Sequence, residues 1–271
     1  MHIDSYLSIS NSKLEDAEFA VYGIPYDATQ SFKPGSRFAP NAIREASWNL
    51  ESFSQFFSCD LSSVRICDAG NVLCDGSFED IGKRVDDLLN KISGIPIALG
   101  GEHTVSILAS KKFKKSCFLV FDAHFDLRDE FDGNKFNHAC TMRRIFDSGF
   151  EVVIVGVRSG CREEREFADR NGIEYVFSWE IKGVRDILEL VEDQRHIYLS
   201  IDMDAFDPSF APGVSTPEPF GLNPNIILPL FSEIAEKIIA MDIVELVPDA
   251  GKITQTLAAK ILFEFISAKI I

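Results

Sequence analysis

Three short segments of the sequence carry histidine and aspartate side chains at spacings that suit metal binding. The candidate ligands are His103 in G-G-E-H-T, then Asp122, His124 and Asp126 in D-A-H-F-D, and finally Asp202 and Asp204 in D-M-D-A-F-D-P. In an extended segment, residues two and four positions apart lie on the same side of the backbone. The ligand types of D-A-H-F-D can therefore converge on one point, and so can the two aspartates of D-M-D.

Four carboxylates brought together in this way would repel one another. At an effective dielectric constant of about 20, each pair of charges about 4 Å apart costs roughly 4 kcal/mol. Six such pairs would exceed the roughly 5–15 kcal/mol by which a folded domain is stable, so bound cations are the simplest way to hold the cluster. Four carboxylates and two imidazoles suit two divalent ions, and oxygen-rich ligation without thiolate favours manganese, with zinc, cobalt or nickel as substitutes. Two such ions can turn a shared water into a hydroxide nucleophile, which predicts a dinuclear metal hydrolase.

Each of the three segments follows a short apolar run that is typical of a buried strand. The sequence predicts eight strands, at Phe19–Ile24, Val64–Asp68, Ile95–Leu99, Cys117–Asp122, Val152–Val157, Glu174–Phe177, Ile197–Ile201 and Ile239–Val244. Most of these runs are apolar throughout rather than alternating, as expected for strands covered on both faces.

Helical patterns lie between the predicted strands. Apolar residues recur at helical spacing from Phe78 to Ile92 and from Leu257 to Ile266, and Pro40 suits the first turn of a helix. This alternation predicts an α/β protein with a mainly parallel sheet and helices on both faces. An open three-layer sandwich and a closed eight-stranded barrel both fit the pattern. In either architecture, ligands bind at the carboxyl ends of the strands, where the three metal-binding segments begin.

Composition narrows the range of partners. The 271 residues carry a net charge of −15, which disfavours nucleic acid and anionic lipid as partners and suits a cationic small molecule. No apolar run is long enough to span a membrane, and the first residues show no signal peptide. The six cysteines form no C-x-x-C pair and indicate reduced thiols in a cytoplasmic protein. No repeat or linker marks a boundary, so residues 1–271 are predicted to form a single domain.

The motifs resemble those of the ureohydrolase family, which includes arginase and agmatinase. G-G-E-H-T, D-A-H-F-D and S-I-D-M-D-A-F-D-P match the family's three metal motifs in order and approximate spacing. The N-terminal G-I-P-Y-D-A-T-Q-S-F-K-P-G-S-R-F-A-P-N-A-I-R resembles the opening block of agmatinases. The resemblance covers nearly the whole chain. It implies an open α/β/α sandwich with a mainly parallel eight-stranded sheet, two manganese ions per subunit, and a homotrimer or homohexamer.

The resemblance also implies roles for individual residues. One manganese would be bound by His103, Asp122, Asp126 and Asp202, and the other by His124, Asp122, Asp202 and Asp204. Asp126 would also pass a proton to the departing amine. His138, in F-N-H-A-C-T-M, would be a proton-shuttle histidine beside the substrate, and Glu245, at the end of the last predicted strand, would pair with the substrate guanidinium.

The loop A-P-G-V-S-T-P-E-P-F-G-L resembles the agmatinase version of this segment and favours agmatine as substrate. Agmatine ends in an ammonium group, which Glu218 in this loop would attract, whereas arginine ends in a carboxylate. Arginine, guanidinobutyrate and formimidoylglutamate are alternative substrates, and a catalytically silent regulatory subunit is the alternative outside enzymes. Several residues depart from the agmatinase pattern around the site: Phe125, Ala139, Cys140, Phe220 and Val247.

Overall fold

The structure is a computed structural model that describes residue 6 and residues 10–271. The sequence prediction that no signal peptide is present falls on the first residues of the chain, most of which lie outside this range. Within the described part of the chain, every helix is too short or too polar to pass through a lipid bilayer.

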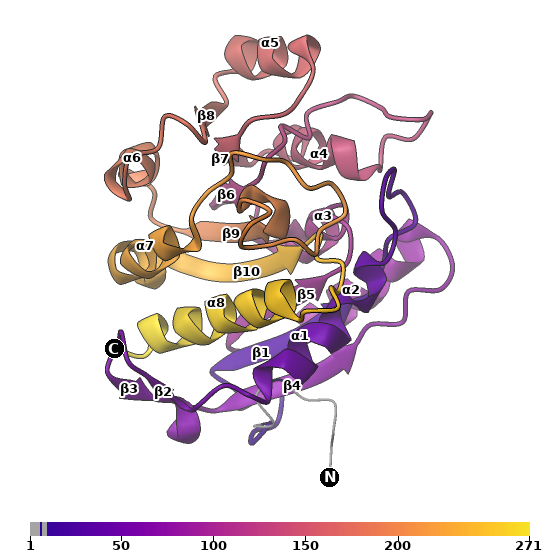
Figure 1. Ribbon diagram of the computed structural model, residues 1–271. Helices are drawn as coiled ribbons and strands as arrows, with labels where there is room; N and C mark the ends of the chain where they lie inside the picture. Colours follow the sequence, from indigo (N-terminus) through magenta and orange to yellow (C-terminus); the bar gives the residue numbers. More distant parts are fainter. Residues whose placement is uncertain (1–5, 7–9) are drawn as a thin grey trace.

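An eight-stranded sheet of entirely parallel neighbours forms the centre of the molecule. Its strands are β1 (Phe19–Ile24), β4 (Ile66–Asn71), β5 (Ile95–Gly100), β6 (Cys117–Phe121), β7 (Glu151–Val157), β8 (Glu174–Phe177), β9 (Ile197–Asp202) and β10 (Ile238–Val244). Their order is β4-β1-β5-β10-β9-β6-β7-β8, with β4 and β8 as the two edge strands (Figure 1). The sheet is therefore open, which confirms the three-layer sandwich and excludes the barrel.

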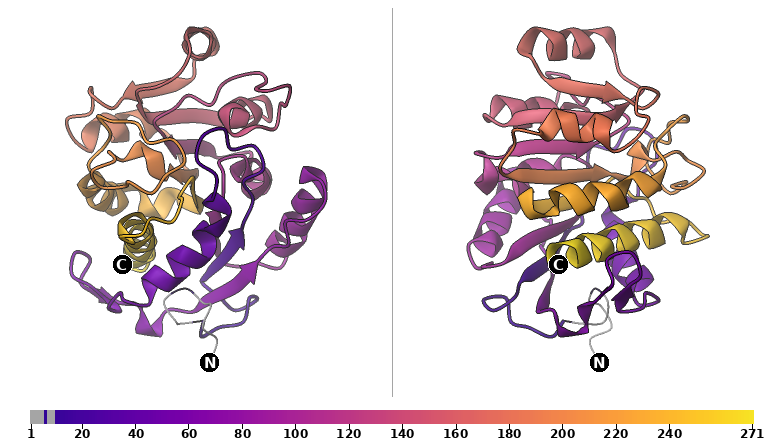
Figure 2. Two further views of the ribbon diagram at one scale, coloured as in Figure 1. Left: turned by 45° about the vertical axis from the view of Figure 1, so that its right-hand side comes forward. Right: turned by 90° about the vertical axis from the view of Figure 1, so that its left-hand side faces the viewer.

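Helices cover both faces of this sheet. Their bounds are α1 (Ala39–Ser47), α2 (Phe78–Leu89), α3 (Val105–Ala109), α4 (Thr141–Asp147), α5 (Arg162–Asn171), α6 (Arg185–Leu188), α7 (Ile227–Ile234) and α8 (Ile253–Lys269). Helices α1, α8 and α7 pack side by side on one face, and α2, α3 and α4 on the other (Figure 2). Pro40 lies in the first turn of α1, as predicted.

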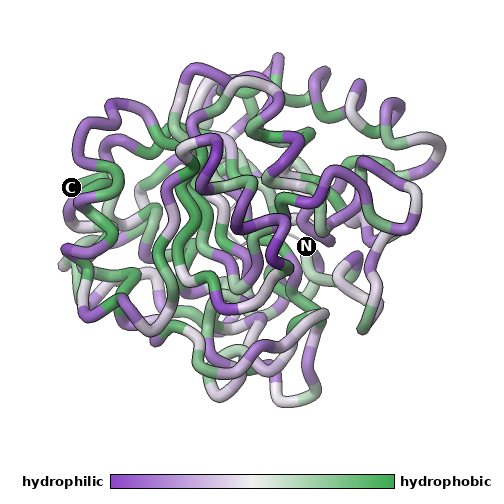
Figure 3. The backbone as a smooth tube through the Cα atoms, turned by 90° about the horizontal axis from the view of Figure 1, so that it is seen from above, coloured by the Kyte–Doolittle hydropathy of each residue, from purple (hydrophilic) through white to green (hydrophobic). Residues whose placement is uncertain are grey.

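The sheet separates two hydrophobic clusters. Leu119 and Phe121 of β6 point into the cluster beneath α7 and α8, whereas Phe118 and Val120 point into the cluster on the α2–α4 side. Successive residues of a strand face opposite sides of the sheet, so a strand that contributes to both clusters needs an apolar side chain at every position. This explains why the central strands are continuously hydrophobic, as Figure 3 shows along the middle of the molecule.

Apart from shifts of one to three residues at other strand ends, two details differ from the predicted elements. Strand β4 begins at Ile66 rather than Val64, because Val64 ends a 3₁₀ turn at Leu61–Ser63. A two-stranded antiparallel pair, β2 (Phe53–Ser54) with β3 (Cys59–Asp60), was not predicted. Neither difference changes the carboxyl edge of the sheet, where the four central strands β5, β10, β9 and β6 are neighbours.

Candidate metal centre

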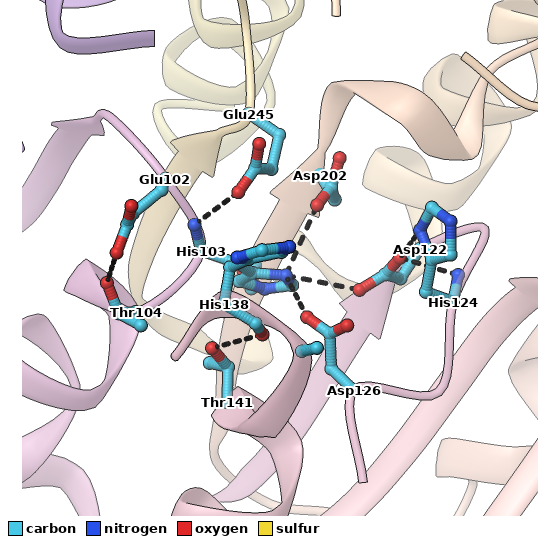
Figure 4. Close-up of polar contacts among 12 residues, drawn as sticks. Glu102, His103, Thr104, Asp122, His124, Asp126, His138, Thr141, Asp202 and Glu245 are labelled. Carbon is cyan, nitrogen blue, oxygen red and sulfur yellow. Dashed lines mark hydrogen bonds and ion pairs between the residues drawn. The ribbon is translucent and has the colours of Figure 1, made fainter. Parts of the chain in front are cut away.

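The carboxyl ends of the four central strands bring the predicted site residues together (Figure 4). His103 follows β5, Glu245 follows β10, and Asp122 follows β6 directly. Asp202 is the last residue of β9, and Asp204 lies in the 3₁₀ turn Met203–Ala205 that follows it. Because these strands are adjacent in the sheet, residues more than a hundred positions apart in the sequence face one cluster.

Backbone N–H groups hold one oxygen of each of three aspartates. The N–H of His124 donates to Asp122 Oδ1 at 2.7 Å, and that of Ala123 donates to Asp204 Oδ1 at 3.1 Å. The N–H of Asp204 donates in turn to Asp202 Oδ1 at 2.8 Å. The second oxygen of each aspartate is left facing an imidazole nitrogen at 3.1–3.2 Å.

Three carboxylate oxygens surround a single nitrogen of His103. Its Nδ1 lies 3.1 Å from Asp122 Oδ2 and 3.2 Å from the Oδ2 atoms of Asp126 and Asp202. One imidazole nitrogen carries at most one proton, so it cannot donate to three acceptors. Both His103 Nδ1 and Asp122 Oδ2 are buried without a hydrogen-bond partner. Buried polar atoms that converge without partners are what a bound cation would satisfy.

The other nitrogen of His103 is engaged beneath the cluster by residues that the sequence motifs did not reveal. Its Nε2 lies 3.3 Å from Ser200 Oγ, whose hydroxyl donates to Asp242. Tyr198 donates to the second oxygen of Asp242 at 2.7 Å. Because the hydroxyl proton of Ser200 is committed to Asp242, its oxygen accepts from Nε2–H. In the neutral imidazole this arrangement leaves Nδ1 as the lone-pair nitrogen, which is the form of histidine that binds a metal.

His124 forms the second half of the cluster, at the wall of the pocket. Its Nδ1 lies 3.1 Å from Asp204 Oδ2 and 3.5 Å from Asp122 Oδ1. Its Nε2 faces Glu218 Oε1 at 3.7 Å. Two overlapping groups could thus hold a cation: His103 with Asp122 and Asp202, and His124 with Asp122 and Asp204. Asp122 belongs to both, so the donor set fits a pair of divalent ions.

The pKa values of these groups reflect the excess of negative charge. Burial alone would lower the pKa of His103, but the surrounding aspartates raise it well above its usual value. His124 shows the same balance, with Asp204 as the strongest charge that raises its pKa. Burial and the charge of Asp122 raise the pKa of Asp126 to about 7. Protons on the imidazoles or on Asp126 and Asp202, or bound cations, balance such a cluster.

Glu245 is held in an unusual backbone conformation at the end of β10. Its φ of 62° lies in the left-handed region, which non-glycine residues rarely adopt and which is found most often at functional sites. Its Oε1 accepts from the N–H of His103 at 2.7 Å, and its Oε2 accepts from the hydroxyl of Ser215 and from Gln30 Nε2. Three neutral donors therefore fix the carboxylate beside the metal cluster.

His138 faces the same cavity from a 3₁₀ turn, His138–Cys140. Its Nε2 lies 3.2 Å from Ser31 Oγ, and its Nδ1 lies 3.5 Å from Thr29 Oγ1. The cavity has a volume of about 290 Å³. It is lined by four of the candidate ligands, His124, Asp126, Asp202 and Asp204, and by Ser31, Arg128, Phe131, His138, Ala139, Ser159, Gly160, Cys161, Glu164, Ser215, Thr216 and Glu245.

Four of the five residues that depart from the agmatinase pattern lie in different surroundings. Phe125 is buried and packs against Tyr175 of β8, with ring centroids 5.1 Å apart. Cys140 is buried, and the side chain of Phe220 is exposed to solvent. Ala139 is the member of these four that lines the cavity. Phe125 therefore contributes to packing, and Ala139 is the departure that can touch a substrate.

Comparison with known proteins identifies the family. The arginase family profile matches residues 17–267 of the chain. The chain belongs to the arginase family. It is 39% identical over 260 residues to an agmatinase of Pyrococcus horikoshii, covering 92% of this chain and 91% of that relative. It is 37% identical over 265 residues to an N(1)-aminopropylagmatine ureohydrolase of Thermococcus kodakarensis, covering 94% of this chain and 91% of that relative.

Solved structures agree with this assignment. The fold superposes on the agmatine ureohydrolase of Thermoplasma volcanium with a TM-score of 0.91 and 35% sequence identity, covering 98% of this chain and 94% of that one. The arginase-family protein described here is thus a ureohydrolase, a metal-dependent hydrolase of amidine groups. Arginase-family proteins bind a binuclear metal centre, and the two clusters around Asp122 are its candidate ligands.

Proposed function

We propose that this ureohydrolase is a dinuclear manganese enzyme that hydrolyses agmatine to putrescine and urea. The observation that carries the metal site is the convergence of three carboxylate oxygens on His103 Nδ1, with that nitrogen and Asp122 Oδ2 both buried and without a hydrogen-bond partner. Oxygen-rich ligation without cysteine supports manganese, with zinc, cobalt or nickel as substitutes. The agmatinase names of several relatives support the substrate.

The cavity is suited to a cationic guanidino compound. Apart from the aspartates of the metal cluster, it is lined by the carboxylates Glu164 and Glu245. Arg128 is the cation at its wall, and its Nε lies 3.7 Å from Glu164 Oε2, so the two charges offset each other. The remaining field is negative, which attracts a substrate with a guanidinium at one end and an ammonium at the other.

Glu245 binds and orients the guanidinium in this proposal. A planar cation pairs well with a carboxylate, because parallel N–H···O bonds fix its orientation. The donors from His103, Ser215 and Gln30 hold the Glu245 carboxylate still, so it directs the guanidinium carbon toward the aspartates. When bound, two divalent ions would supply a hydroxide nucleophile at neutral pH and positive charge to stabilise the tetrahedral intermediate.

Asp126 and His138 move protons in this proposal. Asp126 lines the cavity with its Oδ2 3.2 Å from His103 Nδ1, so its carboxylate lies beside the cluster, where it can accept a proton from the nucleophile and pass it on. His138 lines the same cavity, half-buried, where its imidazole can pass a proton between the leaving amine and solvent. The leaving nitrogen departs as an amine once one of these groups has protonated it.

Glu218 acts through His124 in this proposal rather than on the substrate. Its carboxylate lies 3.7 Å from His124 Nε2, and two hydrogen bonds from Arg158 to its carbonyl oxygen hold its backbone in place. A carboxylate on the outer nitrogen of a metal-binding histidine fixes the ring and strengthens it as a ligand. The competing role is the one predicted from the sequence, in which Glu218 attracts the substrate ammonium.

Two substitutions of Glu218 separate these roles. Glu218→Ala is expected to weaken binding of one of the two manganese ions about 10–100-fold, whereas Glu218→Gln keeps an acceptor for His124 and most of the affinity. At saturating manganese, KM for agmatine is expected to stay near the wild-type value in both. Calorimetric titration with manganese and steady-state kinetics measure the two effects. Unchanged metal affinity together with a raised KM in both variants would instead assign Glu218 to the substrate.

Urea release from agmatine in the presence of added manganese tests the proposed function. We expect agmatine to be hydrolysed faster than arginine, guanidinobutyrate or formimidoylglutamate. N(1)-aminopropylagmatine belongs in the same panel, because relatives from Thermococcus kodakarensis and Synechocystis are named for its hydrolysis. If the folded protein binds two metals but releases no urea from agmatine, the agmatinase assignment is wrong.

A further inference from the structure

A tripeptide in the loop after β1, Thr29–Ser31, contacts two of the proposed catalytic residues at once. Thr29 Oγ1 accepts from the backbone N–H of His138 at 3.0 Å and lies 3.5 Å from its Nδ1. Ser31 Oγ lies 3.2 Å from His138 Nε2, so both imidazole nitrogens face hydroxyls of this tripeptide. Between them, Gln30 donates to Glu245 Oε2 at 3.0 Å. None of these contacts is needed to close a helix or strand.

Glu102, a fully buried carboxylate with no place in the reaction proposed above, anchors this tripeptide. Its Oε1 accepts from the hydroxyl of Thr29 at 2.7 Å and from that of Thr104 at 2.6 Å. Its Oε2 accepts from the backbone N–H of Thr29 at 2.7 Å. Both oxygens of one side chain therefore fix the backbone and the hydroxyl of Thr29.

The backbone around Gly101 brings the loop and the strand end into direct contact. The N–H of Glu102 donates to Tyr26 O at 2.8 Å, and the N–H of Glu245 donates to Gly101 O at 2.8 Å. A Cβ atom at Gly101 would lie only 2.0 Å from Tyr26 O, so glycine is required for this approach. The segment Gly101–His103 is thus bonded to the loop on one side and to Glu245 on the other.

We propose that Thr29, anchored by Glu102, is a positioning residue that sets the place and orientation of His138. The inference rests on the proposed role of His138 in proton transfer. A hydroxyl has one proton, and that of Thr29 is donated to Glu102, so its oxygen is left as an acceptor for His138. Losing this acceptor frees the start of the turn that carries the imidazole. An error of about 1 Å in the position of such a group can cost roughly 100-fold in rate.

Thr29→Val and Thr29→Ser provide the test, because valine keeps the shape of threonine without its hydroxyl and serine keeps the hydroxyl. Thr29→Val is expected to lower kcat for urea release about 10–100-fold, with KM and bound manganese near wild type and a melting temperature lower by a few degrees, because the buried Glu102 loses one donor. Thr29→Ser is expected to stay within about threefold of wild type. The matched control is Thr256→Val, which removes an exposed threonine hydroxyl at the start of α8 and is expected to leave kcat unchanged.

A double-mutant cycle with His138→Ala shows whether Thr29 acts through His138. In the His138→Ala background, adding Thr29→Val is expected to cost less than about twofold in kcat, because the group it positions is already gone. A full additional loss would overturn the inference, and so would a Thr29→Val enzyme with wild-type kcat when His138→Ala alone is impaired. If His138→Ala itself has wild-type kcat, the proposed role of His138 is wrong and the inference falls with it.

Discussion

Replacing Asp122 and Asp204 together with asparagine is expected to abolish metal binding and lower kcat at least about 1,000-fold, or about 4 kcal/mol of activation free energy. Asp122 belongs to both candidate ligand groups, and Asp204 belongs to the group of His124. Asparagine keeps the size of each side chain but removes the negative charge that draws a divalent cation. Elemental analysis of the purified variant and a urea assay measure the two effects.

The same double variant also tests the electrostatics of the metal-free protein. Burial opposes the charge of Asp122, but His103 and His124 lower its pKa well below its usual range. The charge of Asp122 therefore stabilises the fold at neutral pH, and the melting temperature without metal is expected to fall relative to wild type. Added manganese should raise the melting temperature of the wild type but not that of the variant, since only the wild type binds the ion. Asp87→Asn with Asp193→Asn is the matched control, because both residues are exposed and the charge change is equal. If the variant with Asp122→Asn and Asp204→Asn retains two metals and wild-type turnover, the proposed metal centre is wrong.

Glu245→Gln is expected to lower kcat/KM for agmatine by about 100-fold or more while both metals stay bound. The free-energy equivalent is roughly 3 kcal/mol, as expected when one partner of a buried charge pair is neutralised. Glutamine keeps the volume and one carbonyl acceptor for the surrounding donors, so the fold should be retained. Kinetics with agmatine, together with metal analysis and a thermal melt, check each part of this expectation.

Glu245→Ala serves as the comparison for this variant. It leaves the N–H of His103 and the hydroxyl of Ser215 without their buried acceptor, so a loss of roughly 1–3 kcal/mol in unfolding free energy is expected as well. Activity in Glu245→Gln equal to that of the wild type would show that the guanidinium binds elsewhere in the cavity.

The sequence predicted the strands of the sheet well because each is a local apolar run. All eight predicted strands are present, and the fold class is confirmed. The choice between sandwich and barrel needed the strand order, which pairs β5 with β10 across more than a hundred residues and leaves no local pattern. The predicted start of β4 is two residues too early because Val64 belongs to the apolar run that predicts the strand, and it is buried although it lies outside the strand. The prediction of a single domain over residues 1–271 stays a prediction.

The candidate metal ligands could be predicted from the sequence because they too form a local pattern. Histidines and aspartates at spacings of two residues are rare enough to mark a metal site, and the structure brings those side chains together. The residues that support them were not found: Thr29, Gln30, Glu102, Ser200, Ser215 and Asp242. Hydroxyl and amide side chains are common, and their contacts join distant segments, so no spacing reveals them. Glu218 was noticed, but the loop path that carries it to His124 could not be inferred from its motif.

The central claim is that two divalent ions are bound where His103, His124 and the aspartates meet. Counting and identifying the metal in protein purified without chelator and then equilibrated with manganese tests it most directly. We expect two manganese ions per chain in the wild-type protein, and close to zero manganese ions per chain in the variant with Asp122→Asn and Asp204→Asn. A wild-type protein that retains no metal after this loading, or a double variant that retains two ions per chain, would contradict it.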